Sequence, residues 1–292
     1  MSADVSAVSA SKSGLTERQR MLIGRTLSYL TLGIAVILIL FPIYWMIITS
    51  LKLPREIYRT PSLWPQVFTL DNYTDLLFAK GFLRPILNSL IVATSVTVVS
   101  VVFSAFAAYS MVRFRYRFRG LIGRLILFAY LTPGSLLFIP LSILMAQLRL
   151  SNSLQGLVLV YLAFSVPLAT WLLQGYFRGV PRELEEQGLI DGHSRLGALV
   201  RIVLPLSAPG IAAVSIFVFT GAWNEFLFAL VLVTSESQRT APLALNYLIT
   251  SDVLPWGPLM AGAVISSVPL MVLYFVAQRF MVQGLTAGSV KG

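Results

Sequence analysis

The sequence PRELEEQGLIDGHSRLGALVRIVLP, residues 181–205, is the one long segment that is both charged and helix-prone in an otherwise apolar chain. Pro181 suits the first position of a helix, because its fixed φ matches helical geometry and its missing N–H would have no partner there. Glu183, Glu185 and Glu186 follow in the first turn, where the helix dipole favours negative charge. The first half of the segment therefore predicts a short, exposed helix.

The second half of the segment predicts an elbow and another helix. Asp191-Gly192 favours a helix end, because glycine adopts left-handed backbone conformations without steric cost. Ser194 can then cap a second helix that runs into the apolar stretch starting at Ile202. Gly188 lies four residues after Leu184, on the same face of the first helix. Because glycine has no side chain, another surface can approach the helix closely at that point.

The composition identifies an integral membrane protein. Of 292 residues, 57% are hydrophobic and only 12% are charged, and the mean hydropathy is +0.80. Soluble domains carry about 25% charged residues. The chain has no cysteine and one histidine, which excludes a disulfide framework, a cysteine metal site and a thiolate nucleophile.

The apolar runs predict an all-α membrane protein, because about 20 apolar residues cross a bilayer as a helix. Six transmembrane helices are expected, at 26–51, 85–112, 125–148, 156–177, 202–233 and 259–278. The expected organisation is a tail at 1–25, a first span, an outer loop at 52–84, a core of five spans at 85–278 and a tail at 279–292. Within that core, the charged loop occupies 178–201.

Positive charge sets the expected orientation. Of the 22 Lys and Arg residues, 15 fall in the two tails and the loops at 113–124 and 178–201, and 7 fall on the other side. The positive-inside rule then places both termini and the charged loop in the cytoplasm. The basic run RFRYRFRG at 113–120 alternates arginine with aromatic residues, but between two spans it is better explained as a lipid-headgroup anchor than as a nucleic-acid site.

Prolines inside five of the six spans predict kinked or locally unwound helices. They are Pro42, Pro133, Pro140, Pro167, Pro205, Pro209 and Pro269.

The charged loop resembles the EAA loop of permease subunits in binding-protein-dependent ABC importers. The resemblance rests on Glu186, on Gly192 six residues later, and on Ile202-Val203-Leu204-Pro205. The match is incomplete, since Gln187 and Gly188 stand where the family has two alanines, and His193 replaces another.

The resemblance implies a type I ABC importer permease fold and a coupling helix that docks in a cleft of an ATPase subunit. The residues it marks for ATPase coupling are Glu183, Glu186, Gly188, Asp191, Gly192 and Pro205. From local chemistry alone, the same segment is better explained as an ordinary solvated cytoplasmic loop, and the resemblance is what favours the coupling helix. His193 is expected to be a surface residue and not a ligand.

The candidate solute path lies in the fifth span. Glu225 is the single acidic residue in the apolar spans, and such residues usually face a cavity or a partner. An indole and an amide beside it suit a sugar, and the sequence WNEF also resembles the fifth span of sugar-type permeases. On one continuous helix, positions 221, 224, 225 and 228 would share a face. The candidate path residues are Gly221, Trp223, Asn224, Glu225 and Phe228. The alternative is that Glu225 only sits at the outer water interface.

No Gly-x4-Gly-Lys-Ser/Thr loop occurs, so any ATP and Mg²⁺ are expected in partner ATPase subunits and no cofactor in this chain. The C-terminal sequence GLTAGSVKG, 284–292, is typical of a disordered tail, yet it resembles the end of maltose-type permeases, where the tail enters the ATPase interface.

The resemblance thus implies a carbohydrate importer of the cytoplasmic membrane. Its expected partners are a second permease subunit, two ATPase subunits, an extracytoplasmic solute-binding protein, a carbohydrate and membrane lipid. ATP-driven closure would push the helix at 183–191, and the elbow and Pro205 would pass that motion to the fifth span. A permease for a non-sugar solute and an ion-coupled secondary carrier stay open as alternatives.

Overall fold

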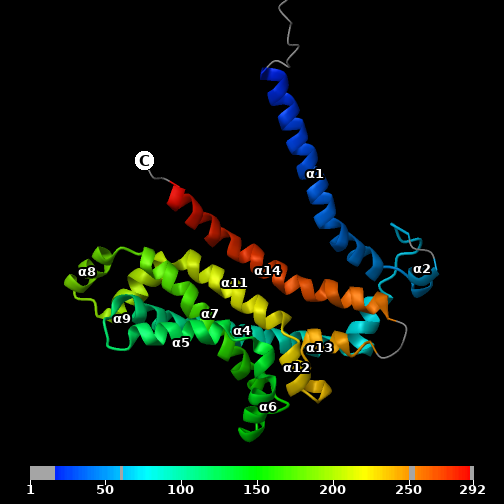
Figure 1. The fold of residues 1–292 in the computed structure, drawn as a ribbon. Helices are drawn as coiled ribbons and strands as arrows, with labels where there is room; N and C mark the ends of the chain where they lie inside the picture. The colour runs from blue at the N-terminus through cyan, green and yellow to red at the C-terminus, as the bar shows by residue number, and fades with distance from the viewer. Residues whose placement is uncertain (1–16, 60–61, 250–253, 290–292) are drawn as a thin grey trace, which may run out of the picture.

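The computed structural model describes residues 17–59, 62–249 and 254–289, and every regular element in these ranges is a helix (Figure 1). Four helices are long and apolar enough to cross a membrane without interruption. They are α1 (Glu17–Ser50), α4 (Leu83–Arg113), α7 (Leu154–Gly179) and α14 (Trp256–Ser289). α1, α7 and α14 continue through Pro42, Pro167 and Pro269 as single helices.

Two further spans are bent pairs of helices. In the first, α5 (Arg119–Leu131) meets the 3₁₀ turn η2 (Gly134–Leu137) and α6 (Phe138–Gln147) at 91°. In the second, α9 (Arg195–Ala198), the π-helical turn η3 (Leu199–Val203) and α10 (Leu204–Leu206) meet α11 (Ala208–Asn224) at 79°. Counting each bent pair as one span gives the six that hydropathy predicts, and both bends lie at or beside a predicted proline break.

The remaining helices are short and lie at the ends of the long ones. They are α2 (Pro54–Arg59), α3 (Asp71–Thr74), the π-helical η1 (Asp75–Ala79), α8 (Arg182–Ile190), α12 (Leu227–Leu232), the 3₁₀ turn η4 (Glu236–Gln238) and α13 (Ala241–Asn246).

Both predicted tails are partly helical. α1 begins at Glu17, so the segment 17–25 extends the first span and is not an irregular tail. α14 likewise continues to Ser289, beyond the expected end of the last span at 278. The remaining tail residues, 1–16 and 290–292, lie outside the described ranges.

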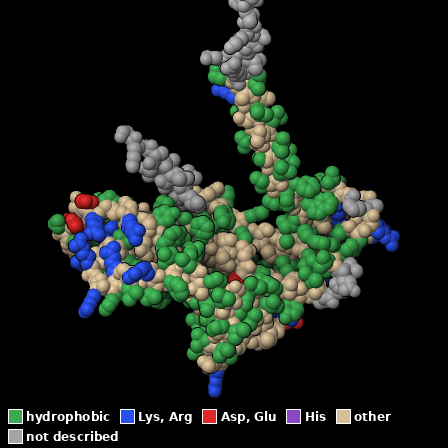
Figure 2. Space-filling view, in the orientation of Figure 1, with side chains coloured by type: hydrophobic (Ala, Val, Ile, Leu, Met, Phe, Trp, Pro, Cys, Tyr) green, Lys and Arg blue, Asp and Glu red, His purple; other side chains and the backbone are tan. Residues whose placement is uncertain are grey.

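On the face that Figure 2 shows, hydrophobic side chains are spread over most elements and charged side chains are few outside the ends of the molecule. Lys and Arg gather at the end of the molecule formed by α5, α8 and α9, with Arg115, Arg117, Arg182, Arg195 and Arg201 exposed there. α1 stands away from the bundle and leaves nearly all of its side chains between 21 and 44 exposed. Its main neighbour is α14. An apolar helix exposed along its length suits contact with lipid tails.

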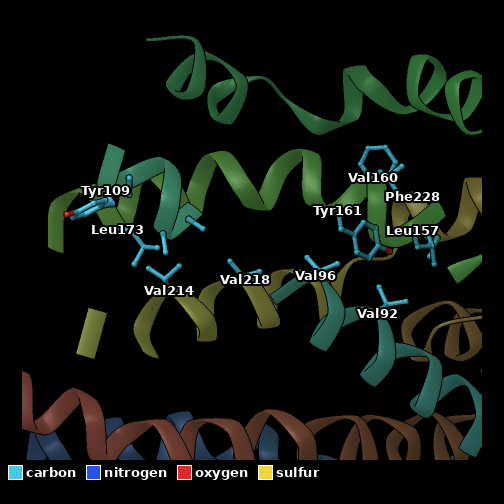
Figure 3. Packing of buried hydrophobic residues seen from close by; sticks show 14 of the residues in the cluster. Val92, Val96, Tyr109, Leu157, Val160, Tyr161, Leu173, Val214, Val218 and Phe228 are labelled. Atoms are coloured by element: carbon cyan, nitrogen blue, oxygen red, sulfur yellow. The ribbon is translucent and has the colours of Figure 1, made fainter. Parts of the chain in front are cut away.

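The core lies where α4, α7 and α11 pack together (Figure 3). The contact between α4 and α7 is the most extensive, and small side chains such as Ser104, Ala108 and Ala169 let the two backbones come close. The Ser104 hydroxyl donates to the Val166 carbonyl at 3.0 Å, beside the proline of α7. A second buried cluster joins the start of α4, the end of α11 and the start of α14 to η1, with Leu76 and Trp223 among its members.

Candidate functional site

α8 and α9 form the elbow that the sequence predicts. Asp191 ends α8, and Gly192 follows with φ of +88°, in the left-handed region. The His193 N–H donates to the Gly188 carbonyl at 2.9 Å and the Gly192 N–H to the Leu189 carbonyl at 3.2 Å. These two bonds form a Schellman motif, which satisfies carbonyls that a helix end would otherwise leave free.

The start of α9 is capped as expected. The Ser194 hydroxyl accepts the Gly197 N–H at 3.1 Å.

Gly188 is the point of close approach between α8 and the base of the fifth span. It is buried, and a Cβ built on it would lie 2.4 Å from Cδ1 of Ile202. No side chain fits there without displacing Ile202. The glycine therefore lets α8 pack directly against η3.

The opposite side of α8 is open. Glu183, Glu186 and Asp191 are exposed, and Ile190 is 85% exposed. On the Gly188 side, between α8 and the base of the fifth span, lies a hollow of about 420 Å³ whose lining includes Gly188, His193 and Pro205. The six residues predicted for ATPase coupling thus lie on this elbow and the hollow beside it.

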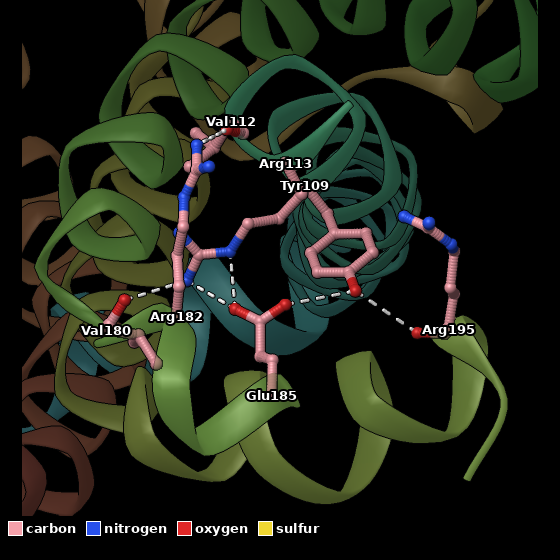
Figure 4. Close-up of polar contacts among 7 residues, drawn as sticks. All are labelled: Tyr109, Val112, Arg113, Val180, Arg182, Glu185 and Arg195. Carbon is pink, nitrogen blue, oxygen red and sulfur yellow. Dashed lines mark hydrogen bonds and ion pairs between the residues drawn. The ribbon is translucent and has the colours of Figure 1, made fainter. Parts of the chain in front are cut away.

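Glu185 has a different environment from the other two glutamates of α8 (Figure 4). It is 6% exposed and forms an ion pair with Arg113, whose Nε donates to Oε1 of the carboxylate and whose Nη2 contacts the same oxygen. The same Nη2 reaches the Val180 carbonyl at 2.8 Å. The Tyr109 hydroxyl lies 3.2 Å from the carboxylate and 3.3 Å from the Arg195 carbonyl.

Glu185 was not among the residues predicted for ATPase coupling. One signal was available: Glu185 lies three residues before Gly188, so both share the face of α8 that packs inward.

The fifth span breaks at Glu225, which corrects the predicted common face of positions 221 to 228. α11 ends at Asn224, and the backbone of Glu225 is extended. Its carboxylate accepts the Phe228 N–H at 2.9 Å and the Ala229 N–H at 3.3 Å, so it satisfies the first amides of α12. The Tyr161 hydroxyl donates to the same carboxylate at 2.5 Å. Glu225 holds the break between two helices, and Phe228 belongs to the second of them.

The five candidate path residues therefore fall into two groups. Trp223 is buried and stacks on Phe219 at 5.7 Å between ring centroids. Phe228 is buried against Phe138, at 4.7 Å, and Phe164, at 5.4 Å. These two side chains support the packing and do not line an open path. Gly221 and Asn224 are exposed and Glu225 is half-buried, so these three positions can reach a solute.

The loop after α12 is tied to the ends of other helices by amide side chains. Asn152 Oδ1 accepts the N–H groups of Thr234 and Ser235 at 3.0 and 2.8 Å. Asn88 Nδ2 donates to the carbonyls of Ser237 and Arg239 at 3.0 and 2.8 Å. This loop begins the segment between the fifth and sixth predicted spans, and it borders a hollow of about 550 Å³ against the segment 80–85. Sequence patterns did not indicate these ties.

The loop between α1 and α4 has a buried polar frame. The Glu56 carboxylate accepts the Ser62 hydroxyl at 2.7 Å and the Gln66 N–H at 3.0 Å. These bonds, chiefly the one from Ser62, hold the pKa of Glu56 below its usual value. Within the described ranges, no three His, Cys, Asp or Glu side chains gather in a way that could hold a metal ion.

Comparisons with known proteins agree with this architecture. The family model described as "Binding-protein-dependent transport system inner membrane component" matches residues 100–287. The sulfoquinovosyl glycerol transport system permease protein SmoH of Agrobacterium fabrum is 36% identical over 92% of this chain and 95% of its own. The trehalose/maltose transport system permease protein MalG of Thermococcus litoralis is 37% identical over 88% of this chain and 93% of its own.

A solved structure shares the fold. A chain of a bacterial ABC transporter that imports the acidic polysaccharide alginate superposes with a TM-score of 0.76 at 22% identity, over 91% of this chain and 99% of that one.

Proposed function

Because this chain belongs to the family of binding-protein-dependent transport system inner membrane components, we propose that it is a permease subunit of an ATP-driven importer for a carbohydrate. The carbohydrate class is supported by relatives whose names specify trehalose and maltose, diacetylchitobiose and sulfoquinovosyl glycerol. These relatives are at least 34% identical over most of this chain. The subunit itself transports and breaks no bond.

The observation that carries the ATP-driven assignment is the exposed coupling elbow. α8 presents Ile190, flanked by Glu186 and Asp191, beside a hollow that ends at Pro205. An apolar side chain of this size exposed in water costs on the order of 1.5–3 kcal/mol relative to a buried one, so a partner that covers it gains affinity. We assign that partner as an ATPase subunit that holds ATP and Mg²⁺.

The complete importer then contains four kinds of chain. This subunit pairs with a second permease subunit within the membrane. Two ATPase subunits dock on the coupling helices, and a solute-binding protein delivers the sugar. A bacterial alginate transporter solved with its periplasmic binding protein supports the last partner. The loop held by Asn88 and Asn152 is the proposed surface for that protein, since its rigid backbone needs little ordering on binding.

The proposed solute path passes the break at Glu225. Asn224 supplies an amide with both donors and an acceptor, and Glu225 adds an acceptor beside it, which suits sugar hydroxyls. Gly221 has no neighbour within 4 Å of where its Cβ would lie, so the backbone is open to an approaching ring.

We propose that both termini and the coupling elbow lie in the cytoplasm. The gathering of exposed arginines around α8 and α9 supports this orientation. Reporter fusions after residues 115 and 190 should lie in the cytoplasm, and those after 65 and 245 outside. A fusion at 190 that reports outside would separate α8 from any cytoplasmic ATPase and refute the proposal.

Transport in proteoliposomes tests the function. The subunit is reconstituted with its sister permease, ATPase and binding protein, and uptake of labelled sugars is followed with ATP present and ion gradients collapsed. Uptake that requires ATP and the binding protein is expected. Uptake that survives without ATP but stops when the ion gradient is collapsed would identify a secondary carrier instead, and uptake confined to non-sugar solutes would overturn the carbohydrate assignment.

A further inference from the structure

α8 is attached to the membrane bundle at two separate places. One attachment is through Glu185, near the start of the helix, and the other is through Gly188 and the elbow near its end. The two attachments lead to different spans.

The first attachment joins α8 to α4. Arg113 is the last residue of α4, and its side chain and that of Glu185 are each only 8% exposed. Two guanidinium nitrogens contact the carboxylate, and one of them also holds the Val180 carbonyl in the turn between α7 and α8. The Tyr109 hydroxyl, one turn earlier on α4, faces the same carboxylate (Figure 4). In return, Arg182 on α8 donates to the Val112 carbonyl at 3.3 Å.

The second attachment joins α8 to the fifth span. Gly188 lies against Ile202 of η3, and the Schellman motif at Gly192 fixes the path of the chain into α9. Arg195 at the start of α9 returns to α4: its guanidinium lies over the Phe114 ring at 5.1 Å, and its carbonyl faces Tyr109. The ring of Phe114 in turn packs edge-on against Tyr109.

The two attachments differ in what motions they resist. The contact of Gly188 with Ile202 is a van der Waals contact, which mainly opposes compression, so pulling reaches the fifth span only through the chain of the elbow. A buried carboxylate gripped by two guanidinium nitrogens is directional, so it opposes pulling and sliding as well. α4 packs against both α7 and α11, so a displacement passed to α4 reaches the whole core.

We infer that Glu185 is a positioning residue that ties the coupling helix α8 to α4 through Arg113 and Tyr109, so that movement of α8 displaces α4 together with the fifth span. This changes the path expected from the sequence, in which the elbow and Pro205 alone carry motion to the fifth span. The inference rests on the proposed function, since it takes α8 as the element that the ATPase moves.

The test measures sugar imported per ATP hydrolysed by the reconstituted importer. Glu185→Gln keeps the shape of the side chain but removes its charge, and the exposed face of α8 is untouched. ATPase subunits should still co-purify and basal ATP hydrolysis should persist. Import per ATP should fall by about fivefold or more, the lower range of typical coupling between sites.

A second variant guards against loss of folding. Arg113→Met combined with Glu185→Leu replaces the buried pair by apolar groups of similar volume, a change that proteins often tolerate. This double variant should assemble and be uncoupled like Glu185→Gln. Asp75→Asn is the matched control, because it removes a carboxylate from the exposed ion pair with Lys80 at 3.2 Å and should leave the ratio unchanged.

Two outcomes would overturn the inference. One is a normal import-to-hydrolysis ratio in the double variant, since packing alone would then suffice. The other is a fall of import and hydrolysis in equal proportion in the assembled variants, which indicates a purely structural role. Ile190→Glu tests the premise separately: if the ATPase still co-purifies with that variant, α8 is not the docking helix and the proposed function itself is wrong.

Discussion

The packing of Gly188 against Ile202 makes a quantitative prediction about a paired substitution. In Gly188→Ala, the new methyl group would lie 2.4 Å from Cδ1 of Ile202, which is well inside contact distance. The next atoms, Cδ2 of His193 at 3.7 Å and Cγ1 of Ile202 at 3.9 Å, are at ordinary distances. A single atom therefore causes the clash, and Ile202→Val removes that atom.

The expected energies follow from the two changes. Overpacking costs about 1–3 kcal/mol, and the lower end is expected here because the clashing atom is the free end of the Ile202 side chain; alanine in a helix gains about 1 kcal/mol over glycine. Gly188→Ala alone should therefore change the free energy of unfolding by about 0 to 2 kcal/mol, in the destabilising direction. Ile202→Val alone costs about 0.5–1.5 kcal/mol. The double variant loses the clash and keeps the helix gain, so it should lie within about 0.5 kcal/mol of the parent chain.

A double-mutant cycle measures this coupling. Unfolding free energies of the four proteins are obtained by denaturant titration in mixed micelles, and the interaction energy should be about 1–3 kcal/mol in favour of the double variant. Gly175→Ala is the matched control, because it also lies in a helix but no atom outside its own helix backbone and chain neighbours lies within 4 Å of its Cβ position. It should be neutral or stabilising, and Ile202→Val should not alter its effect. The reasoning fails if Gly188→Ala behaves like Gly175→Ala and the two substitutions at 188 and 202 are simply additive.

Three further predictions concern the elbow, the break and the tail. Gly192→Val places a β-branched residue at φ of +88° with no other clash, at about 1–3 kcal/mol of strain. The valine variant should insert normally but lose ATPase binding and uptake, whereas Gly192→Asn should retain both. Normal uptake by the valine variant would show that the elbow is an ordinary loop. Glu225→Gln should retain more uptake than Glu225→Leu, because leucine leaves two amides of α12 and Tyr161 without their acceptor. Equal, near-normal uptake in both would contradict a role for the break. Deleting residues 286–292 should spare insertion and lower the ATP hydrolysis that the binding protein stimulates, and unchanged stimulation would exclude a role for the tail.

The spans and the elbow could be predicted from sequence because both depend on local physics. A backbone in lipid must satisfy its own hydrogen bonds, so long apolar runs have to be helices. The Asp191-Gly192 end and the Ser194 cap involve atoms at most five residues apart, and both formed as expected. The bends near Pro133 and Pro205 also follow from local chemistry, since proline removes a backbone donor.

Local chemistry did not decide how each proline acts. α1, α7 and α14 continue through their prolines as single helices, whereas the chain bends near Pro133 and Pro205, so a proline by itself does not fix where a span breaks. Local chemistry also predicted one continuous helix through positions 221 to 228 of the fifth span, whereas α11 ends at Asn224. The break at Glu225 is also held by Tyr161, which is 64 residues away in sequence. Its hydroxyl donates a hydrogen bond to the Glu225 carboxylate.

The sequence by itself determined that this chain is a six-span helical membrane protein with a charged, hinged loop on its basic side. Hydropathy, charge bias and turn chemistry each act over a few residues, so they can be read along the chain. Tertiary structure alone decided that the partner of the buried Glu185 is Arg113, 72 residues earlier. The physical reason is that a buried charge is stable only where another part of the chain supplies the opposite charge and hydrogen bonds, and no local pattern specifies that neighbour.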